Sequence, residues 1–336
     1  MSDGFNLRLR RPRPSVVACS PTLGALGAVN LMPACFAKED ALEARIARSS
    51  RRRRAVSVLL RWLTYAAATV TAAVLLFVVG YILVRGVPAL TPDLFQWEYT
   101  SENVSLLPAL ASTVIMALLA LALAVPVGVG AAIYLVEYAR RGSRFVRLVR
   151  VTAETLQGIP SIIYGLFGML FFVTACGWGL SFLSGACTLA IMVLPVIMRT
   201  TEEALMAVPD SYREGGFGLG AGRLRTVACC VLPSAVPGIL GGVILALGRC
   251  VGEVAALLFT AGTVAQIPDF GGQGIFALFD SCRTLAVHMY TLACEGLHVN
   301  EAYATSVVLL ILVLLLNAAM RVVAQKMEVS KKCRAF

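Results

Sequence analysis

The sequence predicts an all-α protein that crosses a lipid bilayer several times. Hydrophobic residues make up 58% of the 336 residues, and the mean hydropathy of +0.81 is far above that of a soluble domain. Several apolar runs reach the roughly 20 residues that a helix needs to cross the bilayer. These observations together indicate a polytopic membrane protein and exclude a soluble dehydrogenase, kinase or nuclease.

Six apolar runs are expected to be the membrane spans. The second run is longer than a span requires, so it is expected to tilt or to break near Pro126. A tight turn at Gly177-Trp178-Gly179 separates the third run from the fourth. If residues 156–198 form one re-entrant hairpin instead, the number of spans changes. The predicted spans are residues 58–84, 106–136, 156–175, 180–198, 236–261 and 304–319.

Basic residues cluster beside these runs and set the expected orientation, because such clusters stay in the cytoplasm. Six spans then place both termini and the loop 202–233 on the cytoplasmic side. The expected parts are a basic N-terminal extension (1–55), a transmembrane domain (56–325) and a cytoplasmic tail (326–336). The clusters contain Arg8, Arg10, Arg11 and Arg13; Arg51, Arg52, Arg53 and Arg54; Arg140, Arg141, Arg144, Arg147 and Arg150; and Arg321, Lys326, Lys331, Lys332 and Arg334.

The cytoplasmic loop carries the most informative pattern of the chain, a glycine-rich stretch between two long apolar runs. Ser211 and Glu214 have the spacing of a capping box at the start of a helix. Gly220 suits the left-handed residue that follows a helix end. The pattern predicts a helix of roughly two turns, a turn, and a second helical stretch that runs into Pro233.

This stretch resembles the loop of permease subunits of ABC importers, whose pattern is E-A-A, three residues, G, nine residues, I-x-L-P. Glu214, Gly220 and the pair Leu232-Pro233 match it, whereas Gly215 and Gly216 replace the two alanines, and Cys230 replaces the isoleucine. The resemblance implies a six-helix permease of type I and a coupling helix that docks on a separate ATPase. Each glycine costs about 1 kcal/mol of helix propensity relative to alanine, so the partner is expected to help order the helix. The alternative is an ordinary capped helix.

Two ionisable residues in the fifth run, Arg249 and Glu253, are candidates for a translocation site. Charged groups at membrane depth are costly and usually face a bundle interior or an aqueous path. Their i, i+4 spacing allows an ion pair, which in the alternative interpretation only holds helices together. Arg199, at the end of the fourth run, either faces the pathway or extends to the cytoplasmic interface, and the second interpretation is favoured.

Three blocks, residues 158–168, 194–203 and 249–253, resemble the permease of the phosphate-specific importer, and its A-type subunit more than its C-type partner. The resemblance covers roughly residues 105–325. It implies that Arg249, Glu253 and also Arg199 act in phosphate passage. It further implies a C-type second permease subunit, a dimer of ATPase subunits that binds the ATP, a periplasmic phosphate-binding protein, and the bacterial inner membrane as location. No cofactor is expected in this chain.

Other functions find less support in the sequence. The chain lacks the G-x-x-x-x-G-K-[ST] loop of an ATPase and the G-x-S-x-G and H-E-x-x-H motifs of membrane enzymes. Its net charge of +10 comes from basic clusters beside the spans, not from a nucleic-acid-binding surface. A permease for another oxyanion or solute, a membrane-embedded enzyme and a passive channel remain the alternatives.

The cysteine and histidine residues suggest no metal site, because the chain has no C-x-x-C pair. Cys282 and Cys294 fall in an outer loop where a disulfide is an open alternative. His288 and His298 lie in the same loop and are expected at the surface.

Overall fold

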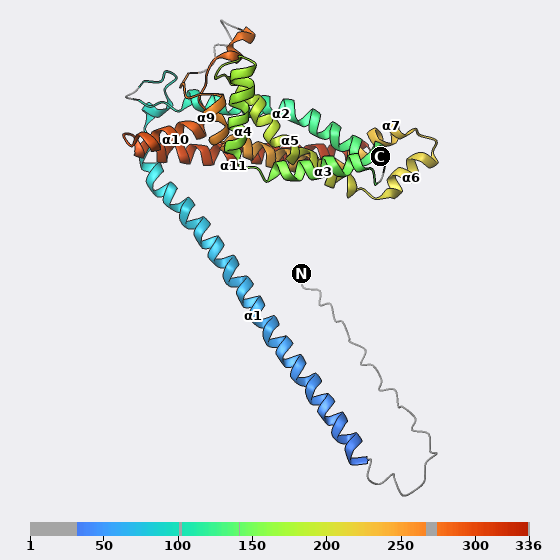
Figure 1. Ribbon diagram of the computed structural model, residues 1–336. Helices are drawn as coiled ribbons and strands as arrows, with labels where there is room; N and C mark the ends of the chain where they lie inside the picture. Colours follow the sequence, from blue (N-terminus) through green and yellow to red (C-terminus); the bar gives the residue numbers. More distant parts are fainter. Residues whose placement is uncertain (1–31, 101–102, 141, 267–273, 335–336) are drawn as a thin grey trace. The chain divides into compact units, whose positions relative to one another are not determined.

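Every regular element that the structure describes is helical (Figure 1). This computed structural model describes residues 32–100, 103–140, 142–266 and 274–334. The chain divides into two compact units, with the boundary between Leu76 and Phe77. Five helices in the described residues are long and apolar enough to span a membrane, and one bent pair of helices is a further candidate.

The first unit, in its described part, is the beginning of one long helix, α1 (Met32–Gly86). The predicted first span lies within the apolar segment Val56–Ala89. The hydroxyl groups of Thr64, Thr69 and Thr71 each donate to the carbonyl four residues earlier, so they carry no unpaired donor into the lipid. Of the predicted N-terminal extension, residues 32–55 belong to α1, and residues 1–31 lie outside the described part.

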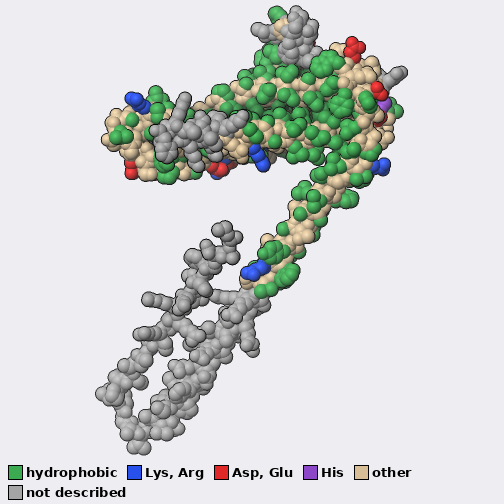
Figure 2. Space-filling view, turned by 180° about the vertical axis from the view of Figure 1, so that it is seen from behind, with side chains coloured by type: hydrophobic (Ala, Val, Ile, Leu, Met, Phe, Trp, Pro, Cys, Tyr) green, Lys and Arg blue, Asp and Glu red, His purple; other side chains and the backbone are tan. Residues whose placement is uncertain are grey.

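The second unit is a bundle built on three long helices. The helix α5 packs against both α2 and α8, and α11 packs against α8. Hydrophobic side chains cover most of the face seen in Figure 2. The elements are η1 (Val87–Ala89), η2 (Pro92–Phe95), α2 (Leu107–Ile133), the π turn η3 (Tyr134–Tyr138), α3 (Arg144–Gln157), α4 (Ser161–Gly168), the π turn η4 (Met169–Ala175), α5 (Phe182–Met206), α6 (Asp210–Gly218), α7 (Arg223–Thr226), the π turn η5 (Val227–Val231), α8 (Leu232–Gly252), α9 (Ala255–Thr260), η6 (Gly274–Phe279), α10 (Leu285–Glu295) and α11 (Val299–Arg334).

Small residues let the central helices approach closely. A side chain at Gly242 of α8 would overlap the Thr200 hydroxyl on α5, and one at Gly238 would come within 2.6 Å of Ala204. Helices in a bilayer gain little from the hydrophobic effect, so their association depends on such van der Waals packing. These glycines therefore fix the contact between α5 and α8.

The predicted third span, residues 156–175, is broken near its beginning, where proline and small residues allow either close packing or a break. The chain bends by 102° between α3 and the segment Ser161–Ala175. Pro160 causes the break, because it has no N–H to donate and restricts the residue before it. The hydroxyl of Tyr164 donates to the carbonyl of Leu156 at 2.8 Å across the bend.

The predicted outer loop, residues 263–303, contains more structure than its sequence suggested, because α10 lies within it. The prediction that His288 lies at the surface is wrong: the side chain is fully buried beneath Tyr99, with ring centroids 6.1 Å apart. His298 is partly exposed and lies 3.8 Å from Glu301. Cys282 is buried and Cys294 is exposed, and both are free thiols, so the disulfide is not formed.

Acidification is expected to destabilise the end of the bundle that carries α10, through His288. Burial and the nearby Arg283 guanidinium lower the pKa of His288 from 6.5 to about 4. Between these values the unfolded chain binds more protons than the folded one, so stability is lost as the pH falls below about 6.5. We expect a loss of about 2 kcal/mol between pH 7 and pH 5, measured as a fall in thermal midpoint of the detergent-solubilised chain. H288Q should remove most of this dependence of the thermal midpoint on pH, whereas H298Q should leave it unchanged. If H288Q kept the full pH dependence of the thermal midpoint, His288 would not be its cause.

Candidate functional site

The predicted coupling helix is α6, and it begins in a different way from the predicted capping box. The N-cap residue is Pro209, and no side chain caps the helix there. Ser211 lies within the first turn, so the predicted Ser211–Glu214 capping box is wrong. Asp210 provides the acidic group of the first turn, where a negative charge interacts favourably with the helix dipole. Glu214 is exposed on the same helix.

The end of α6 follows the prediction closely. Gly220 has a φ of +76°, in the left-handed region. Its N–H donates to the carbonyl of Phe217 at 2.9 Å, and the N–H of Ala221 donates to the carbonyl of Gly216 at 3.1 Å. These two bonds form a Schellman motif, which satisfies carbonyls at the helix end. After this turn, α7, η5 and α8 continue to and past Leu232 and Pro233, as predicted.

The two glycines in place of alanines have different surroundings. A Cβ at Gly216 would lie 2.6 Å from the Thr226 methyl group on α7, whereas nothing lies within 4 Å of a Cβ at Gly215. Gly216 therefore permits close contact between α6 and α7 of this chain. Gly215 leaves open space at the exposed surface of α6.

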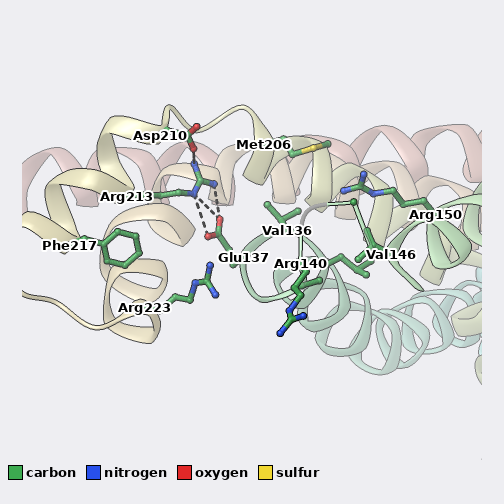
Figure 3. Close-up of a pocket in the computed structure, with 13 residues that line it drawn as sticks. Val136, Glu137, Arg140, Val146, Arg150, Met206, Asp210, Arg213, Phe217 and Arg223 are labelled. Carbon is green, nitrogen blue, oxygen red and sulfur yellow. Dashed lines mark hydrogen bonds and ion pairs between the residues drawn. The ribbon is translucent and has the colours of Figure 1, made fainter. Parts of the chain in front are cut away.

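A buried ion pair anchors α6 to the bundle. The Arg213 guanidinium lies 2.7 Å from the Glu137 carboxylate at the end of η3, and these side chains are only 15% and 7% exposed (Figure 3). Arg213 also donates to the backbone carbonyls of Leu205 and Val208 at 3.0 and 2.9 Å, and to Asp210 at 3.2 Å. The hydrogen bond to Glu137 is the main cause that raises the pKa of Arg213. One guanidinium thus joins the ends of α2, α5 and α6.

Beside this ion pair lies a pocket of about 550 Å³ (Figure 3). Apolar walls come from Val136, Val146, Met206 and Phe217. Its charged lining comes from four arginines and two carboxylates: Arg140, Arg150, Arg213, Arg223, Glu137 and Asp210. No group of three or more potential metal ligands occurs in the described part of the chain.

Arg249 and Glu253 do not form the predicted i, i+4 pair. The helix α8 ends at Gly252, and Glu253 has an extended backbone with ψ of 126°. Its carboxylate instead accepts a hydrogen bond from the Ala256 N–H at 3.3 Å, at the start of α9. The predicted fifth span, residues 236–261, is therefore interrupted at Glu253. Arg249 stays on the last turn of α8, partly exposed, and forms no ion pair with a described carboxylate.

Arg199 belongs to a separate cluster. Its guanidinium lies 2.8 Å from Glu154 on α3 and 2.8 Å from Glu203 on the next turn of α5. All three side chains are at least 36% exposed. Arg199 therefore has two charge partners, and no described ion pair links it to Arg249 or Glu253.

Comparison with protein families decides the general identity. The model of the binding-protein-dependent transport system inner membrane component matches residues 124–329. The chain belongs to this family. It is the permease of an ABC importer, a multi-pass membrane protein that works with an ATPase and a substrate-binding protein.

Several permeases are similar over most of their length. The probable ABC transporter permease protein YqgI of Bacillus subtilis is 35% identical over 268 residues, which cover 76% of this chain and 90% of the relative. The phosphate transport system permease protein PstA of Pasteurella multocida is 33% identical over 249 residues, 72% of this chain and 84% of the relative. The PstC permease of Mesorhizobium japonicum is 30% identical, covering 69% and 77%. The predicted resemblance to phosphate permeases is thereby confirmed.

Solved structures of ABC importers share the fold. An inward-facing MetNI methionine transporter matches with a TM-score of 0.51 and 21% identity, over 74% of this chain and 97% of that chain. A bacterial alginate transporter in complex with its periplasmic protein matches with a TM-score of 0.53 and 17% identity, over 78% and 95%. These likenesses confirm the predicted all-α permease fold.

Sequence reasoning missed the anchoring residue of this permease. Arg213 directly precedes Glu214, but its partner Glu137 is 76 residues away along the chain. In the sequence, Glu137 comes directly after an apolar run and directly before a basic cluster. An acidic residue at the end of a span was the one sequence feature that could have indicated a buried ion pair. It does not indicate which basic residue completes the pair.

Substitution of the two glycines of α6 is expected to have opposite effects. G216A places a methyl group against Thr226 and should destabilise the α6–α7 contact by about 1–3 kcal/mol, the cost of overpacking. G215A meets no neighbour and should stabilise α6 by up to about 1 kcal/mol through helix propensity. The thermal midpoint of the purified permease measures both. Equal effects of the two substitutions would contradict the packing at Gly216.

Proposed function

We propose that this permease imports inorganic phosphate as the A-type subunit of an ATP-driven system. The relatives named as phosphate transport system permeases support this substrate, whereas YqgI leaves it unnamed. The proposed assembly contains a PstC-like second permease, a dimer of PstB-like ATPase subunits and a PstS-like periplasmic phosphate-binding protein. ATP binds to the ATPase dimer and not to this chain. Both termini and α6 face the cytoplasm.

The position of Arg249 is the structural observation that best supports phosphate as the substrate. It lies on the last turn of α8 with no described carboxylate in ion-pair range. A guanidinium stays charged at any physiological pH and presents two donors to phosphate oxygens. Glu253 lies near the same break but is engaged with α9. A single arginine then makes a transit site that phosphate occupies and leaves, as conduction requires.

Import of phosphate requires coupling to ATP. Moving a negative charge inward against an inside-negative potential costs about 2.3 kcal/mol per 100 mV. A passive pore would therefore release phosphate from the cell. In the proposed cycle, closure of the ATPase dimer moves α6, and the anchored ends of α2 and α5 follow it. Arg199 acts at the cytoplasmic end, where Glu154 and Glu203 compensate its charge.

Loss of Arg249 is expected to abolish uptake while the permease still assembles. In cells that lack this chain, radiolabelled phosphate uptake should be restored by the natural protein. R249A should lower it at least tenfold, because a charge-assisted hydrogen bond is lost, and R249K should retain more activity than R249A. Sulfate and molybdate serve as control substrates. Normal phosphate uptake by R249A, at equal membrane levels, would remove Arg249 from the pathway. Sulfate or molybdate uptake in place of phosphate would favour the alternative, a permease for another oxyanion.

Charge reversal on α6 is expected to separate ATP hydrolysis from transport. E214K changes an exposed residue of the docking helix, so it should disturb the contact with the ATPase without disturbing the bundle. We expect the loaded binding protein to stimulate hydrolysis by the reconstituted complex less than half as strongly, since docking weakens by about 1 kcal/mol or more. E295K, the same substitution at an exposed position at the end of α10, is the control. Equal stimulation in E214K and the natural complex would argue against docking through Glu214.

A further inference from the structure

The pocket beside Arg213 lies at the level of a membrane surface. Glu137 lines it at the end of the candidate span Leu107–Tyr138, and Met206 lines it at the end of the span Phe182–Met206. Two spans therefore end at this pocket. Tyr134 and Tyr138 are exposed next to it, as aromatic residues are at the boundary between lipid and water. This position places the pocket at the level of lipid headgroups.

The pocket has an excess of positive charge. Glu137 and Asp210 both pair with Arg213, and the Arg150 guanidinium pairs with the buried Glu202, so four arginines face three carboxylates. Arg140 and Arg223 also line the pocket, and no ion pair joins either to a carboxylate in the described ranges. The Arg223 guanidinium lies over the Tyr138 ring, 5.9 Å from its centroid. Two guanidinium groups from different elements thus remain available to an anion.

An exposed apolar stripe runs along α3 on the side of the helix that faces away from the pocket. Val146 and Arg150 of this helix line the pocket. Phe145, Leu148 and Val151, spaced three residues apart, are 58%, 64% and 54% exposed. At about 100° per residue, this spacing places the three side chains on one side of α3, roughly opposite Val146 and Arg150. An exposed apolar stripe beside basic residues is the pattern of a helix in contact with a lipid surface.

We propose that this pocket binds a phosphate-group anion, supplied by the headgroup of an anionic phospholipid. Arginine matches phosphate oxygens with paired donors, and basic pockets between spans on the cytoplasmic side are typical headgroup sites. The exposed stripe of α3 supports a lipid as the source, because it places this helix at the lipid surface beside the pocket. An acidic segment of a partner protein would use the same arginines but does not require a site at the membrane surface. A bound headgroup lies between α3 and α6 and so restrains the coupling helix.

Native mass spectrometry of the full-length chain in detergent tests the proposal. Phosphatidylglycerol is the probe, phosphatidylcholine is the uncharged comparison, and inorganic phosphate at millimolar concentration is the third arm. We expect R140Q/R223Q to bind phosphatidylglycerol about thirtyfold more weakly, for two arginines lost at a membrane surface. The control R144Q/R147Q removes the same charge from exposed positions of α3 outside the pocket lining. It should bind within about threefold of the natural chain.

The outcomes separate the sources of the anion. Equal loss in both double variants would overturn the pocket site, since only net charge would matter. Displacement of the lipid by inorganic phosphate would support the shared phosphate chemistry, and binding of inorganic phosphate alone would overturn the lipid as its source. If R140Q/R223Q kept its lipid but lost a copurifying ATPase, the pocket would be a protein-docking surface and the proposal would be wrong. A thermal midpoint of R140Q/R223Q near that of the control ensures that folding is not the cause.

Discussion

The end of this permease that carries α6 depends on one buried guanidinium, that of Arg213. Its donors reach the Glu137 carboxylate, the carbonyl of Leu205 in the last turn of α5 and the carbonyl of Val208 just after it. Removing such a charge from water is costly unless it is paired and fully hydrogen-bonded, and here five N–H groups meet several acceptors. A helix of nine residues with three glycines, such as α6, has little stability of its own. Its position therefore comes from this anchor and from the contact of Gly216 with Thr226.

This anchoring gives a physical basis for coupling. Because packed helices respond as rigid bodies rather than by continuous deformation, a displacement of α6 is passed to the ends of α2 and α5. The close contact of Gly242 with Thr200 then carries it from α5 to α8. Arg249 lies near the far end of α8. The route from the proposed ATPase contact to the proposed transit site is thus a series of close helix contacts within one unit.

Breaks in the helices distinguish the real spans from the predicted ones. Hydropathy counts apolar residues but does not report backbone direction, so it gave straight spans across Pro160 and Glu253. The first break follows from the missing N–H of proline. The second break separates Glu253 from Arg249, and the Glu253 carboxylate accepts a hydrogen bond from the Ala256 N–H instead. An i, i+4 spacing predicts a pair only where the helix is continuous, and this helix ends at Gly252.

The sequence by itself determined the membrane class, the helical fold, most of the span positions and the turn at Gly220, because these depend on local composition and on backbone preferences of single residues. Tertiary structure alone decided which charges meet. The Arg213–Glu137 pair and the burial of His288 beside Tyr99 join distant parts of the chain, and the reason for glycine at 216 is a contact with Thr226 that forms only when α7 folds back on α6. Local patterns contain no information on such distances, since ion pairing and burial depend on positions in space.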